Sequence, residues 1–72
     1  MSKDINSIVG WNIKKVRNDL NITQVKLWEL SWISRTALSQ IETGDKSPTI
    51  KTLELIANAL EVDIKDLFNN EN

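Results

Sequence analysis

The chain has 72 residues and a formal net charge of −1, and it contains neither cysteine nor histidine. This length predicts a single domain over residues 1–72, close to the lower limit for a hydrophobic core that is stable alone. Because cysteine and histidine are absent, the usual disulfides, zinc ligands and general base are missing, so we expect no metal, no cofactor and no enzyme activity. We find no signal-peptide pattern and no apolar run long enough for a membrane span, so we expect a cytoplasmic protein without a membrane partner.

Charge is distributed unevenly along the chain. Residues 1–51 carry eight basic and five acidic side chains, whereas residues 52–72 carry one basic and five acidic side chains. A basic N-terminal part and an acidic C-terminal part suit a domain that offers one face to phosphate and another face to a different partner. Such an asymmetry also arises by chance in a short chain.

Apolar residues recur at helical spacing in the first half of the chain, and no segment alternates as a strand would. The first helix is expected over residues 7–19. Thr23 and Ser34 are typical N-cap residues, which predicts further helices over residues 24–30 and 35–43. Gly44 stands where a left-handed residue commonly ends a helix.

The second half of the chain predicts two more helices. Pro48 disfavours helix immediately before it, and Thr49 is expected to cap a fourth helix after the loop. The buried face of this helix is expected to contain Ile50, Leu53, Ile56, Ala57 and Leu60. Asp63 is expected to cap a short fifth helix, followed by a polar tail over residues 69–72. Short connections between short helices predict a compact all-α, five-helix bundle.

Residues 23–43 have the layout of a helix-turn-helix, in which a helix and a tight turn precede a second helix with polar residues on its first turn. The accompanying motifs are Asn12-Ile13-Lys14-Lys15-Val16-Arg17, Ile22-Thr23-Gln24, Leu38-Ser39-Gln40-Ile41-Glu42-Thr43-Gly44, Ser47-Pro48-Thr49 and Thr52-Leu53-Glu54-Leu55-Ile56-Ala57. Together they resemble the Cro/repressor-type helix-turn-helix DNA-binding domain over about residues 9–68. Stand-alone members of this length resemble small phage-type repressors or the controller proteins of restriction–modification systems.

The resemblance implies a transcription regulator that binds double-stranded DNA in a sequence-specific manner. It implies base contacts from the outward face of the second helix of the motif, by Arg35, Thr36, Ala37, Ser39 and Gln40. Phosphate contacts are implied for Thr23, Gln24, Ser34, Thr43, Lys46 and Ser47. A structural ion pair is implied between Arg17 and Glu42. Without the resemblance, the outward face of residues 35–40 is an ordinary solvated helix face.

One short recognition helix makes few DNA contacts, so we expect a homodimer that reads a palindromic site with half-sites about one helical turn apart. The expected dimer surface is apolar and close to the C-terminus: Leu60, Val62, Ile64, Leu67 and Phe68.

Three tryptophans depart from the family pattern. Trp28 stands where alanine is usual between the two helices, and Trp32 stands where the turn usually has a glycine with positive φ. Overpacking costs about 1–3 kcal/mol, and a positive φ costs roughly a further 1–2 kcal/mol. The first two helices are expected to form an antiparallel hairpin around Asn21-Ile22-Thr23. This hairpin would bring Trp11 beside Trp32, so that the three tryptophans form one cluster.

Two hypotheses follow for the tryptophans. They are either an internal aromatic cluster or an exposed patch that anchors a protein partner or a second copy. The second hypothesis gives the alternative function: a helix-turn-helix scaffold that associates through Trp11, Trp28 and Trp32, by domain swapping or partner binding, with weakened DNA binding. The departures also favour the interpretation of the chain as an engineered variant of a natural repressor-like domain.

Overall fold

The structure is a computed structural model that describes residues 4–69. These residues contain no strand and form α1 (Ile5–Asp19), α2 (Gln24–Ser31), α3 (Arg35–Thr43), α4 (Ile50–Leu60) and the 3₁₀-helix η1 (Ile64–Phe68). The predicted all-α class is therefore confirmed, although residues 70–72 of the predicted polar tail lie outside the described residues. None of the described helices is both long and apolar enough to cross a lipid bilayer.

Three helices start at the predicted caps Thr23, Ser34 and Thr49. The Thr23 hydroxyl accepts a hydrogen bond from the Lys26 N–H at 3.0 Å, and the Ser34 hydroxyl accepts one from the Ala37 N–H at 3.1 Å. Helix α1 begins two residues earlier than predicted, because the Asp4 carboxylate accepts a hydrogen bond from the Ser7 N–H at 2.9 Å. Each cap satisfies a backbone donor that has no partner inside its helix.

The fifth predicted helix is a 3₁₀-helix, so the described residues form four α-helices and one 3₁₀-helix. Its i→i+3 bond runs from the Asp66 N–H to the Asp63 carbonyl at 2.9 Å, and the Asp63 side chain makes no cap hydrogen bond. A segment of five residues is too short to repay the cost of nucleating an α-helix, and the tighter 3₁₀ form is common in such short pieces.

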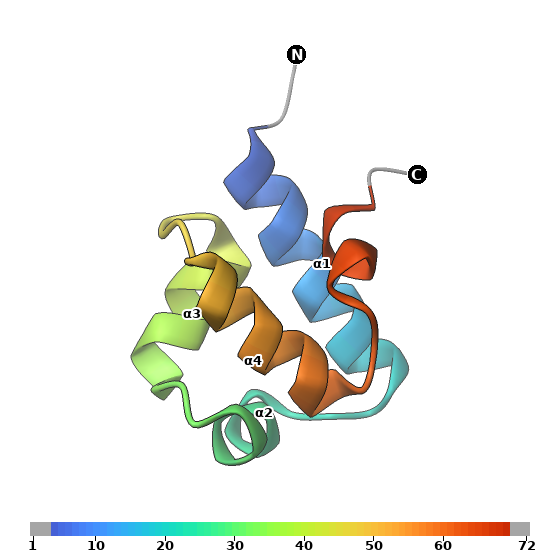
Figure 1. Cartoon of the computed structure of the whole chain (residues 1–72). Helices are drawn as coiled ribbons and strands as arrows, with labels where there is room; N and C mark the ends of the chain where they lie inside the picture. The colour runs from blue at the N-terminus through green and yellow to red at the C-terminus, as the bar shows by residue number, and fades with distance from the viewer. Residues whose placement is uncertain (1–3, 70–72) are drawn as a thin grey trace.

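The helices surround one apolar core. Figure 1 shows α4 near the middle of the view, with α3 on its left, α1 and η1 on its right and α2 below it. Helix α1 packs against α3 and η1, whereas α2 packs against α3 and α4. The expected α1–α2 hairpin is therefore not formed. The core contains ten buried side chains: Val9, Ile13, Leu27, Leu38, Ile41, Leu53, Ile56, Ala57, Leu60 and Leu67.

Ile50 does not belong to this core, contrary to the sequence prediction. Its side chain is 70% exposed, whereas Leu53, one turn further along α4, is buried. Ile50 is the first residue of α4. Ile50 lies on the same side of α4 as the buried residues, as predicted. It is exposed because the other helices do not cover the first turn of α4.

Two glycines let α1 lie close to the C-terminal end of α3. A Cβ atom at Gly10 would overlap the backbone carbonyl oxygens of Ile41 and Glu42. A Cβ atom at Gly44 would lie 2.9 Å from the Ser7 hydroxyl oxygen, and Gly44 has a φ of +86°. Glycine is thus required at both positions, and the close approach fixes where α3 sits on the bundle.

Candidate nucleic-acid interface

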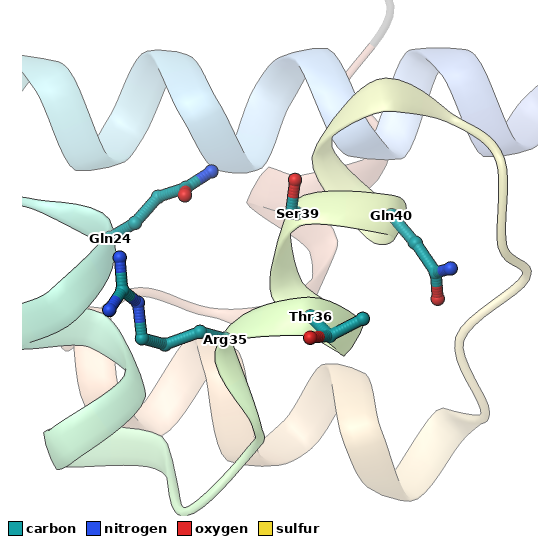
Figure 2. A pocket seen from close by; sticks show the side chains of 5 residues that line it. All are labelled: Gln24, Arg35, Thr36, Ser39 and Gln40. Carbon is teal, nitrogen blue, oxygen red and sulfur yellow. The ribbon is translucent and has the colours of Figure 1, made fainter.

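The outward face of α3 and the start of α2 line an open, shallow hollow of about 520 Å³. Its lining residues are Gln24, Arg35, Thr36, Ser39 and Gln40 (Figure 2). Four of the five residues predicted to contact bases are therefore together on one surface. The fifth, Ala37, is half-buried and is not in the lining.

This face is polar because the opposite face of α3 supplies the core. Leu38 and Ile41 are buried, whereas Arg35, Ser39 and Gln40 are exposed. In Figure 2 the Arg35 guanidinium points across the hollow towards Gln24, and Gln40 points towards the loop after α3. Arg35 forms no salt bridge within residues 4–69. Its five N–H donors are thus available to a ligand with paired acceptors.

A buried ion pair fixes α3 relative to α1. Arg17 donates from Nε to Glu42 Oε2 at 2.8 Å and from Nη2 to Glu42 Oε1 at 3.0 Å, and both residues are 8% exposed. Arg17 Nη1 also donates to the Ile22 carbonyl at 2.8 Å. The two charges are paired in the bidentate geometry that a guanidinium and a carboxylate favour.

Gln24 joins this network from α2. Its amide nitrogen donates to Glu42 Oε1 at 3.0 Å, so that α1, α2 and α3 meet at one carboxylate. Gln24 was predicted to contact phosphate, and the structure gives it this internal contact as well as a place in the lining of the hollow. The start of α2 is therefore held at a fixed position beside α3.

The other predicted phosphate contacts lie at the N-termini of α2 and α3 and around the C-terminal end of α3. Thr23 and Ser34 are exposed caps at the N-termini of α2 and α3, where backbone N–H groups favour an anion. Lys46 and Ser47 are exposed in the loop after α3. The Thr43 hydroxyl lies 3.1 Å from the Gln40 carbonyl and 3.0 Å from the Asp45 carboxylate.

Asp45 is the residue at this interface that sequence reasoning missed. Its carboxylate accepts from the hydroxyl of Thr43, and its N–H donates to the Gln40 carbonyl at 2.9 Å. Asp45 therefore ties the loop to the end of α3. The available signal was an acidic residue directly after the expected Gly44 cap, close to a threonine.

The family model described as "Helix-turn-helix" matches residues 13–67. The chain belongs to the helix-turn-helix family of transcription regulators. The resemblance predicted from the motifs is confirmed.

Individual helix-turn-helix relatives agree with this assignment. The chain is 36% identical over 63 residues to the immunity repressor protein of Bacillus phage phi105, which is 88% of this chain but 44% of that protein. It is 31% identical to control protein C.SmaI of Serratia marcescens over 94% of this chain and 81% of that protein. Its fold matches the crystal structure of the wild-type restriction–modification controller protein C.Esp1396I with a TM-score of 0.83 and 39% identity, over 93% of this chain and 87% of that one. None of these similarities supports the interpretation as an engineered variant.

All three tryptophans are exposed in the structure, so the hypothesis of an internal aromatic cluster was wrong. The exposed fraction is 52% for Trp11, 41% for Trp28 and 89% for Trp32. Trp32 has the positive φ expected for its turn position, at +66°. Since α1 and α2 do not form a hairpin, the argument that placed Trp11 beside Trp32 also fails.

The predicted dimer surface also needs correction. Leu60 and Leu67 are buried in the core, so they cannot form part of a surface that the folded monomer offers. Val62 and Ile64 are half-buried and line a hollow of about 420 Å³ with the exposed Ile50. Phe68, at 38% exposed, lies at the end of η1. Leucines close to the C-terminus are poor surface candidates in so small a chain, because its few large apolar side chains are needed inside.

Proposed function

We propose that this chain is a homodimeric transcription regulator that binds double-stranded DNA in a sequence-specific manner. The observation that carries the proposal is the polar outward face of α3, fixed beside the start of α2 by the Arg17–Glu42–Gln24 network. A rigid helix with unpaired donors on its outward face suits insertion into the major groove.

Each α3 residue then has a distinct role. Arg35 donates to guanine O6 and N7, and Gln40 bonds adenine N6 and N7. Thr36, Ala37 and Ser39 make smaller contacts, including one with a thymine methyl group. Thr23, Gln24, Ser34, Thr43, Lys46 and Ser47 hold the protein on the phosphate backbone. The base contacts select the sequence, and the phosphate contacts set the register.

A second copy supplies the other half of the site. The surface that fits it best is the hollow lined by Ile50, Val62 and Ile64, because Ile50 exposes a large apolar side chain there. A two-fold dimer through this surface places two copies of α3 for a palindromic site. We expect Ile50→Glu to reduce the light-scattering mass to that of a monomer, whereas Ile5→Glu, at another exposed isoleucine, leaves the dimer intact.

Selection from a random pool of duplexes tests the proposed function. The parent protein is expected to enrich a palindromic sequence. Arg35→Ala should lose discrimination at one base pair per half-site, by about 1–3 kcal/mol. Lys51→Ala, which removes an exposed charge from α4, is the control and should select the same sequence as the parent. Failure of the parent to enrich any sequence would contradict the proposal.

The alternative function, protein association through tryptophan, has one supporting observation. Val25 and Trp28 are exposed three residues apart on α2, and Trp32 is exposed at the left-handed residue that ends this helix. Association through these side chains predicts a light-scattering mass that is insensitive to salt and falls on Trp32→Gly. The relatives favour the DNA-binding function, since they are named as repressor and control proteins.

A further inference from the structure

The outward face of α1 presents a row of hydrogen-bond donors that the proposed function does not use. Ser7, Trp11, Lys14 and Asn18 recur at i, i+4, i+7 and i+11, which places them along one side of the helix. We call these four residues the α1 stripe. Trp11, Lys14 and Asn18 are exposed, and with Lys15 and Asp19 they line a hollow of about 310 Å³. Hydroxyl, indole N–H, ammonium and amide groups are all donors, as a phosphate ligand requires.

The α1 stripe connects two segments that are proposed to contact phosphate. At one end, Ser7 lies directly against Gly44, at the start of the loop that carries Lys46 and Ser47. At the other end, the Asn18 carbonyl accepts from the Asn21 N–H at 3.0 Å, in the turn that leads to Thr23. The stripe therefore runs along one border of the surface that α3 dominates. Figure 2 shows α1 passing beside the lining residues at this border.

Lys14 lies at the edge of α1 that is nearest to α3. The residues four before and three after it are Gly10, which touches the carbonyls of Ile41 and Glu42, and Arg17, which pairs with Glu42. Residues three and four apart are neighbours on a helix surface, so Lys14 lies beside the contact between α1 and α3. Its side chain is exposed to solvent.

The two neighbouring lysines differ in their partners. Lys15 is paired with Asp19 at 2.8 Å, whereas Lys14 forms no ion pair within the described part of the chain. An unpaired ammonium beside a DNA-reading face is well placed for a backbone phosphate, because its charge is not neutralised by the protein.

We propose that the α1 stripe is a further phosphate-binding surface, in which Lys14 pairs with a backbone phosphate beside the groove that α3 enters. Trp11 and Asn18 donate hydrogen bonds to the same stretch of backbone. This inference rests on the proposed DNA-binding function and adds a contact that carries no sequence information. The stripe strengthens binding to every duplex equally and leaves the preferred sequence unchanged.

The test measures the affinity for one non-specific duplex of about 30 base pairs at several salt concentrations. Each phosphate that is neutralised contributes about 0.9 to the slope of log K against log salt. Lys14→Gln should reduce that slope by about 0.9 per protomer and weaken binding about eight-fold per protomer near 0.1 M salt. Lys14→Arg should keep the slope of the parent. Lys65→Gln, which removes the same charge from η1, is the matched control and should also keep it.

The outcomes separate this inference from the proposed function. If the parent does not bind DNA, both are wrong. If the parent binds and Arg35→Ala loses selectivity, but Lys14→Gln keeps the slope of the parent, only the α1 stripe is overturned. An equal loss of slope in Lys14→Gln and Lys65→Gln would also overturn it, because the effect would then be one of net charge.

Discussion

The helices α2 and α3 end in the same backbone conformation, with different residues and for different reasons. Both end on a left-handed residue, Trp32 with φ +66° and Gly44 with φ +86°. At Gly44 the space for a side chain is already filled by Ser7. At Trp32 the side chain extends into solvent and is 89% exposed. At position 44, both the backbone conformation and the packing favour glycine. At position 32, only the backbone conformation favours glycine, because the side chain lies in solvent.

The two helix ends also differ in how they are held. The end of α3 is fixed by the Glu42 carboxylate, which receives hydrogen bonds from α1 and α2. Within residues 4–69, the end of α2 has one side-chain hydrogen bond, from the Ile33 N–H to the Ser31 hydroxyl at 3.3 Å. The end of α3, beside the proposed DNA-binding face, is therefore held by more side-chain hydrogen bonds than the end of α2, where an unusual residue is tolerated.

Removing the Glu42 carboxylate should have the largest effect. Glu42→Ala leaves the Arg17 guanidinium buried without its partner, which typically costs about 3–5 kcal/mol of unfolding free energy. Urea unfolding followed by circular dichroism measures the loss. Lys15→Ala is the control, because its pair with Asp19 is exposed and an exposed pair is worth about 0–1 kcal/mol. Similar losses in the two variants would mean that the network does not brace α3.

Gly44→Ala should cost about 2–5 kcal/mol in the same assay. The left-handed conformation accounts for roughly 1–2 kcal/mol, and the contact of the new Cβ with Ser7 adds a cost of the order of overpacking, about 1–3 kcal/mol. Ser7→Gly in the same chain removes the hydroxyl in the way and should restore part of the steric cost. If the double variant is no more stable than expected from the two single changes, the two sites do not interact.

How far the sequence predicts this molecule depends on whether the determining interactions are local. The caps at Thr23 and Ser34 and the left-handed Gly44 were predictable, because each depends on neighbours within a few residues. The exposure of Ile50 and the burial of Leu67 were not, because they depend on which parts of the helices the bundle covers. The polar face of α3 was predicted as a whole, whereas the bond between Asp45 and Thr43 required the path of the loop.

Trp32→Gly should stabilise the chain, in the opposite direction to Gly44→Ala. Relief of the left-handed conformation contributes roughly 1–2 kcal/mol, and the greater freedom of glycine in the unfolded chain removes about 0.5–1 kcal/mol, leaving a gain near 1 kcal/mol. A higher urea midpoint is the expected result. Glu61→Gly is the matched control, since Glu61 has a φ of +60° at the end of α4 and involves no tryptophan. A gain in Glu61→Gly but not in Trp32→Gly would mean that the exposed indole stabilises the fold.

The smallest effect is expected for a change at the turn after α2, where a side-chain hydrogen bond joins Ser31 and Ile33. Ser31→Ala removes the acceptor of the Ile33 N–H, and a typical intramolecular hydrogen bond contributes about 0.5–1.5 kcal/mol. The loss should lie at the lower end, because 3.3 Å is long for such a bond. Amide hydrogen exchange at Ile33 reports the bond directly and should become faster in Ser31→Ala, while exchange at Ala37, which bonds to Ser34, stays the same. A loss as large as that of Gly44→Ala would show that the turn after α2 is braced as firmly as the end of α3, and the contrast between the two helix ends would not hold.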